Sequence, residues 1–132
     1  MAAVCPATGQ AEGLISERLD TAVVQLFLDQ IAATIPSHKH IVMIWDGAPY
    51  HTAKALRIPA CMTILRQPAY SPELNPVENL WHYLRSHHWS NRNYKDLDAV
   101  EAAAMTAWHS TCLKPEIIKT VCGCPYLNSG SL

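Results

Sequence analysis

Five consecutive apolar residues, IVMIW at 41–45, constrain the fold more than any other stretch of this 132-residue chain. Because the run lacks polar alternation, it predicts a strand buried on both faces, as in a parallel sheet. The run MTILR at 62–66 predicts a second buried strand. Helical spacing of apolar residues predicts helices over 20–36, 76–88 and 97–109, with a short helix near 51–57. This order is typical of the α/β class.

Short elements are expected at both ends of the chain. AVCPA at 3–7 and GLISER at 13–18 predict two strands of a hairpin around a turn that contains Gly9. The C-terminal part predicts one short helix followed by a loose tail. We therefore predict one domain over residues 1–125 and a tail over 126–132.

Composition narrows the class of protein. Hydrophobic residues make up 49% of the chain and charged residues 16%, which is typical of a globular domain. The net charge is −1, whereas a self-sufficient DNA-binding domain is more often basic. If nucleic acid is the partner, most of the charge that neutralises phosphates must therefore come from elsewhere.

Targeting and redox features favour a cytoplasmic protein without a membrane segment. No apolar run reaches the roughly 18 residues of a membrane span, and the N-terminus lacks the pattern of a signal peptide. The five cysteines are an odd number without paired spacing, so we predict reduced thiols. Cys122 and Cys124 are too close together for the usual zinc half-site.

Asp46 directly follows the first predicted buried strand. In open α/β sheets, ligands bind beyond the carboxyl ends of the strands, so a carboxylate here is held by a stiff strand and faces solvent. Asp-Gly is also a common pair in turns. Position alone leaves both a functional acid and a turn residue open.

Glu78 has two compatible interpretations. Asn75 is a good N-cap and Pro76 suits the first helical position, which places Glu78 third in the helix, where its side chain completes a capping box. The capped turn also fixes the backbone that a metal-binding carboxylate needs. The apolar stripe of the helix, Val77, Leu80, Trp81 and Leu84, is expected to face the core.

DGAPYH at 46–51 followed by QPAYSPELNPVENLW at 67–81 resembles the catalytic core of mariner-like insertion-sequence transposases. These belong to the DDE superfamily and have an RNase H-like fold. In that family the second catalytic Asp opens a D-(N/G)-A-x-x-H segment, and the third acid lies inside S-P-x-L-N-P-x-E. The resemblance implies that Asp46 and Glu78 are catalytic and metal-binding residues. His51 and Asn75 match the motif histidine and asparagine; a histidine without a role and a simple helix cap are the alternatives.

The family's first catalytic Asp lies on the central first strand of its fold, and no position here matches it. Asp20 and Asp29 fall at the start of a predicted helix and within it. The resemblance therefore implies an incomplete RNase H-like fold, a mixed sheet flanked by helices that lacks the central strand. We expect a C-terminal transposase fragment, from truncation or a split reading frame. It would be active only when completed by the N-terminal transposase segment or another transposase subunit.

The implied chemistry is DNA transposition by metal-dependent hydrolysis and transesterification at transposon ends. The complete family site uses two Mg²⁺ ions about 3.5–4 Å apart, and this chain is expected to hold one weakly at most. Arg85, Arg92 and Lys95 form a possible phosphate-contacting patch, with surface solvation as the alternative. A non-catalytic remnant or interaction module that binds DNA or a transposase subunit stays open, while S-P-E-L-N-P-V-E disfavours a different RNase H-like nuclease.

Overall fold

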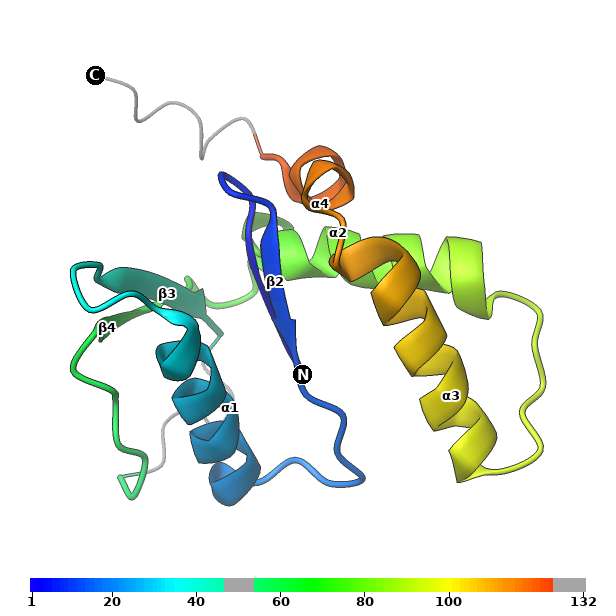
Figure 1. Ribbon diagram of the computed structural model, residues 1–132, viewed down its shortest axis with the longest axis horizontal. Coiled ribbons are helices and arrows are strands. Elements are labelled where there is room, and N and C mark those ends of the chain that lie inside the picture. Colours follow the sequence, from blue (N-terminus) through cyan, green and yellow to red (C-terminus); the bar gives the residue numbers. More distant parts are fainter. Residues whose placement is uncertain (47–53, 125–132) are drawn as a thin grey trace. The chain divides into compact units, whose positions relative to one another are not determined.

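The computed structural model describes residues 1–46 and 54–124, in which there are four α-helices and four strands (Figure 1). The first half contains two strands, a helix and two further strands in that order, and helices dominate the second half. The predicted α/β class is therefore confirmed. The chain divides into two compact units. Among the described helices, none is long and apolar enough to cross a membrane.

The first unit, Met1 with Gly13–Asn75, contains one long helix, α1 (Thr21–Thr34). The carboxylate of Asp20 accepts a hydrogen bond from the backbone N–H of Val23 at 3.0 Å, so Asp20 is the N-cap of the helix that the sequence predicts to start there. The apolar residues at helical spacing form the buried side of α1, as expected: Val24, Phe27, Leu28 and Ile31.

The two buried-strand predictions have the correct bounds but the wrong burial. β3 (Ile41–Trp45) and β4 (Met62–Arg66) form a parallel pair in which Ile41 lies opposite Met62 and Trp45 opposite Arg66. Trp45 and Met62 are buried, whereas Val42 is 58% exposed and Ile44 is 52% exposed. Because side chains alternate along a strand, one face of this pair is covered and the other is open.

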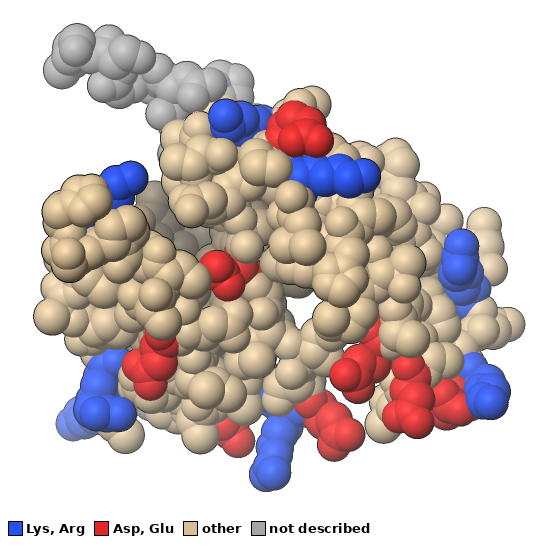
Figure 2. All heavy atoms as spheres, viewed as in Figure 1, with Lys and Arg blue, Asp and Glu red and all other residues tan. Residues whose placement is uncertain are grey.

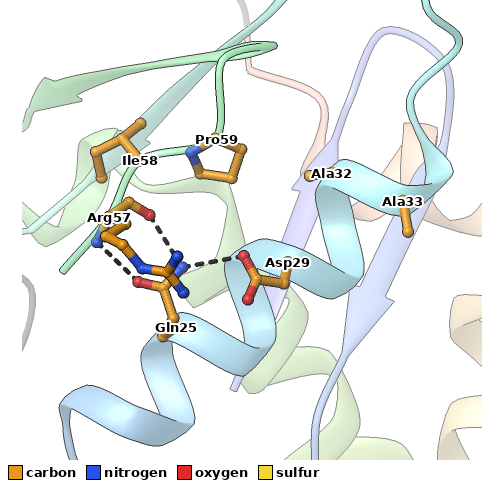
Figure 3. Close-up of a pocket in the computed structure, with 7 residues that line it drawn as sticks. All are labelled: Gln25, Asp29, Ala32, Ala33, Arg57, Ile58 and Pro59. Atoms are coloured by element: carbon orange, nitrogen blue, oxygen red, sulfur yellow. Dashed lines mark hydrogen bonds between the residues drawn. The ribbon is translucent and has the colours of Figure 1, made fainter.

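An open pocket of about 400 Å³ lies between α1 and the segment before β4 (Figure 3). On its polar side, the side chain of Gln25 forms two hydrogen bonds with the backbone of Arg57, which we call the Gln25 clamp. Gln25 accepts from the N–H of Arg57 at 2.7 Å and donates to the carbonyl of Arg57 at 3.0 Å. Gln25 also donates to Asp29 at 3.0 Å. The clamp fixes the approach to the amino end of β4, so we assign the pocket a structural role.

The N-terminal hairpin is tighter than predicted. β1 (Ala2–Cys5) pairs with β2 (Gln10–Gly13), so the second strand is not at 13–18. The carbonyl of Cys5 accepts from the N–H of Thr8 at 3.2 Å and of Gly9 at 2.8 Å, which closes the turn early. Within the described residues the strands form two pairs, β1 with β2 and β3 with β4, and the incomplete RNase H-like sheet stays a prediction.

Helices build the second unit, which comprises Ala2–Glu12 and Pro76–Leu132. α2 (Pro76–Leu84) continues into a π-helical turn over Arg85–Trp89, which confirms the predicted helix over 76–88. The next helix, predicted over 97–109, is α3 (Leu97–Ala107) with a π-helical turn at its end over Trp108–Cys112. The predicted short C-terminal helix is α4 (Pro115–Cys122).

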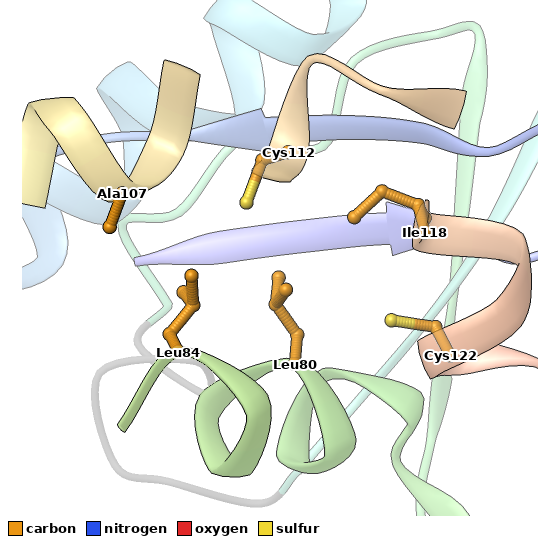
Figure 4. Packing of buried hydrophobic residues seen from close by; sticks show 6 residues of the cluster. All are labelled: Leu80, Leu84, Ala107, Cys112, Ile118 and Cys122. Atoms are coloured by element: carbon orange, nitrogen blue, oxygen red, sulfur yellow. The ribbon is translucent and has the colours of Figure 1, made fainter. Parts of the chain in front are cut away.

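The core of the second unit lies between α2, α4 and the turn that follows α3 (Figure 4). Figure 4 shows Leu80 and Leu84 of α2 pointing toward the residues of the other elements. The buried members of this core are Leu80, Leu84, Ala107, Cys112, Ile118 and Cys122. The hairpin contributes Val4 and Ala11 to its edge, and three tryptophans of the unit pack against it.

The predicted helix near 51–57 is not seen in its described part. Lys54 and Ala55 form a turn, and residues 56–59 have no regular secondary structure. Residues 51–53 and the predicted tail over 126–132 lie outside the described residues, so the domain boundary at residue 125 stays a prediction.

All five cysteines are free thiols, as predicted, and two of them have strongly altered acidity. Burial, with a smaller contribution from the neighbouring Cys122, raises the pKa of Cys112 to about 12. Burial and the nearby Cys124 raise the pKa of Cys122 to about 11. Since the thiolate is the reactive form, both thiols should be inert in the folded chain at neutral pH.

We expect the stability of the chain to fall as the pH rises from about 9 toward 11–12, because the folded state holds these two protons more tightly than the unfolded state. Urea unfolding at successive pH values measures this slope. In a parallel iodoacetamide experiment, the exposed Cys5 should react in the native state, whereas Cys112 and Cys122 should react only after unfolding. Fast native labelling of Cys112 would contradict the burial described above.

Candidate active site

The carboxyl edge of the β3–β4 pair carries the first candidate acid. Asp46 follows Trp45, the last residue of β3, and is exposed. At the same edge the backbone N–H of Gln67, the residue after β4, donates to the carbonyl of Trp45 at 2.8 Å. This bond extends the parallel pairing by one step, so Asp46 sits on a braced strand end that faces solvent, as predicted.

A compact turn follows β4. The side-chain amide of Gln67 donates to the carbonyl of Ser71, and a short 3₁₀-helix spans Pro72–Leu74. The backbone N–H of Asn75 donates to the carbonyl of Pro72 at 3.0 Å. Asn75 has an extended backbone directly before the first residue of α2, which is the position of an N-cap.

Glu78 lies in the first turn of α2 and is exposed. The apolar stripe behind it is confirmed, since Leu80 and Leu84 are buried and Val77 and Trp81 are half-buried. A carboxylate at this point is favoured by the partial positive charge of the helix N-terminus. The hydrogen bonds of the capping box stay a prediction, as does the role of Asn75.

Asp46 belongs to the first unit and Glu78 to the second, so their meeting at one metal ion remains a prediction. Both are carboxylates placed at the ends of regular elements and exposed, which is the donor chemistry that Mg²⁺ prefers. No cluster of three or more potential metal ligands occurs among residues 1–46 and 54–124. His51 lies outside the described residues.

The three predicted phosphate contacts are exposed residues of the second unit. Arg85 begins the π-helical turn after α2, and Arg92 and Lys95 lie between that turn and α3. The ammonium of Lys95 is 3.8 Å from the carboxylate of Asp96, so its charge is partly compensated. Figure 2 shows acidic and basic side chains interspersed on the face drawn, consistent with the net charge of −1. The phosphate-binding role of these residues stays a prediction.

Two residues of the turn after β4 were not predicted from the sequence as part of the site: Gln67 and Tyr70. Gln67 braces the strand end beside Asp46, and Tyr70 is fully exposed with a positive φ of 56°. The place of Gln67 follows from the β3–β4 register, because a parallel pairing of IVMIW with MTILR puts Asp46 opposite the residue after Arg66. No sequence signal gives the backbone conformation of Tyr70.

Comparison with known proteins gives a family for most of the chain. The family described as DDE superfamily endonuclease matches residues 1–101, a range that contains both candidate acids. The chain is also 36% identical over 119 residues to an uncharacterized protein of Sinorhizobium fredii, y4pE/y4sA, and the alignment covers 90% of this chain and 88% of that protein. No solved structure matches the chain. The chain belongs to the DDE superfamily endonuclease family.

Proposed function

We propose that this chain provides two carboxylates, Asp46 and Glu78, to a transposase of the mariner-like insertion-sequence type that cuts and joins DNA. DDE-type endonuclease domains act on DNA, generally with a divalent metal. The observation that carries the proposal is the match of the family across both acidic motifs. The exposed position of Asp46 at a carboxyl sheet edge supports it, because ligands of open α/β sheets bind there.

In this proposal the strand or helix that carries each acid determines how its carboxylate is positioned. Asp46 holds a negative charge at a fixed point, because β3 and the Gln67 bond restrain its backbone. Glu78 lies in the first turn of α2, so the start of that helix positions its carboxylate. Both carboxylates would hold Mg²⁺, which would supply charge stabilisation to a reacting phosphodiester. Arg85, Arg92 and Lys95 contact phosphates of transposon-end DNA.

The first catalytic Asp of the family, in our proposal, comes from a separate transposase segment or subunit. Two acids of the first unit already have structural roles. Asp20 caps α1 through the N–H of Val23, and Asp29 accepts from Gln25 within the same helix. Neither follows a strand, so neither replaces an acid held at a strand in the centre of a sheet.

A complementation assay tests the proposal. The chain is combined with the N-terminal catalytic segment of a DDE transposase that carries the first Asp, and nicking of supercoiled plasmid is measured with Mg²⁺ or Mn²⁺. We expect metal-dependent nicking by the combination, none when that first Asp is changed to Asn, and little by the chain alone. Equal nicking by the chain alone would contradict the separate origin of the first acid. DNA binding without nicking in any combination would favour the non-catalytic interaction module instead.

A further inference from the structure

Tyr70 combines two unusual features among the described residues. Its side chain is 100% exposed, and its φ is 56°. A bulky residue with φ in this region is a steric outlier, because its Cβ crowds the neighbouring backbone. An exposed ring gains nothing from burial that offsets this strain. Strained residues of this kind cluster at functional sites, so the feature calls for a function.

The turn that carries Tyr70 is braced within the first unit. At its start, the N–H of Gln67 donates to the carbonyl of Trp45 at 2.8 Å, one residue before Asp46. At its end, the side-chain amide of Gln67 donates to the carbonyl of Ser71, whose hydroxyl donates back into the turn at 3.2 Å. Tyr70 therefore projects from a fixed turn that begins at the same sheet edge as Asp46.

The turn that carries Tyr70 also contains a buried polar atom without a hydrogen-bond partner among the described residues. That atom is the side-chain oxygen Oε1 of Gln67. A buried acceptor without a partner is destabilising, as is a left-handed tyrosine. The turn that presents Tyr70 thus contains two energetically unfavourable features.

We propose that Tyr70 stacks on an unpaired base of the DNA that is bound at the edge of Asp46. The inference rests on the proposed function, which makes DNA the partner. Every base has a π-face, so an exposed aromatic ring binds single-stranded DNA with little sequence preference. A base inside a duplex has both faces covered by its neighbours, so the contact requires a single-stranded tail or a frayed end. Tyr70 is thus a DNA-binding residue and takes no part in the chemistry.

Fluorescence anisotropy in EDTA, with the full chain, measures this contact without any metal. A duplex with a single-stranded tail is compared with a blunt duplex. The wild-type chain should bind the tailed DNA more tightly. Tyr70→Gly should bind the tailed DNA about tenfold more weakly and the blunt duplex unchanged, because one base stack is lost. Tyr70→Phe should keep the preference for the tail.

Glycine at position 70 also separates binding from folding. Because glycine adopts a positive φ without strain, Tyr70→Gly should melt at the same temperature as the wild type or higher. Asn91→Gly is the matched control, since Asn91 has a φ of 55° outside this turn and its replacement should leave DNA binding unchanged.

Three outcomes would overturn the inference: tail binding by Tyr70→Gly equal to wild type, a lower melting temperature for that variant, or no DNA binding by the wild-type chain. The EDTA assay is independent of catalysis. If Tyr70→Gly weakens binding to the tailed DNA but the completed enzyme does not nick DNA, only the proposed chemistry is refuted.

Discussion

Asp46→Asn is expected to lower the rate of DNA nicking by the completed enzyme at least about a thousandfold. Asparagine keeps the size of the side chain but loses the charge that Mg²⁺ requires, and metal stabilisation of a phosphoryl transition state is worth several kcal/mol. Because Asp46 is exposed, the melting temperature of the chain should stay within about 2 °C of wild type. Initial nicking rates and thermal unfolding of the same samples measure both effects.

Glu78→Gln gives the companion test, because glutamine still serves at the third position of a capping box. We expect a similar loss of nicking with unchanged helix stability. Glu73→Gln is the matched control, since Glu73 is an exposed acid of the preceding 3₁₀-helix and should be dispensable. A Glu78→Gln enzyme that nicks DNA as fast as wild type would reduce Glu78 to a helix cap and refute its catalytic role.

Gly9→Ala is expected to destabilise the second unit by about 3 kcal/mol or more. Gly9 has a φ of 78°, which is itself unfavourable for alanine by about 1–2 kcal/mol. An added Cβ would lie 2.3 Å from the carbonyl oxygen of Pro115 and 2.6 Å from its Cα. Both are backbone atoms at the start of α4, so the hairpin would have to move away from the helix.

Urea unfolding followed by tryptophan fluorescence checks this prediction, because Trp81, Trp89 and Trp108 pack against the core of that unit. Asparagine tolerates a positive φ, so Gly9→Asn separates the backbone strain at position 9 from the steric overlap of the new Cβ with Pro115. If the close approach to Pro115 dominates, Gly9→Asn should be nearly as unstable as Gly9→Ala. Ala7→Ser, at an exposed position of the same turn, should change the stability by less than about 0.5 kcal/mol. Wild-type stability of Gly9→Ala would contradict the described packing.

Local signals were sufficient to predict most of the regular elements. Asp20 before an apolar periodic run marked the start of α1, and five apolar residues marked β3 from Ile41 to Trp45. Burial was harder to predict, because an uninterrupted apolar run does not show whether one or both faces of a strand are covered. Val42 and Ile44 are exposed for this reason. The predicted position of the second hairpin strand was wrong because the length of the turn depends on the conformation and contacts of Gly9.

The candidate acids were found because each lies in a motif beside a strand or helix end. Asp46 follows β3 and Glu78 lies in the first turn of α2, as the sequence predicted. Gln67 and Tyr70 were missed because their features depend on strand register and on a backbone dihedral angle. Neither property is encoded in residue type alone. Tyrosine in particular rarely adopts a positive φ, so propensity argues against its observed conformation.

Asp46 and Glu78 are proposed to hold the same metal ion. Iron-directed cleavage tests it directly: Fe²⁺ replaces Mg²⁺, ascorbate and peroxide generate hydroxyl radicals at the metal, and the cut backbone positions are mapped. If the two acids share one ion, the cuts should form two clusters, one near Asp46 and one near Glu78. Asp46→Asn should abolish both clusters, and Glu78→Gln should also abolish both. Cuts near only one of the two acids, or two clusters that respond separately to the two substitutions, would contradict a shared ion.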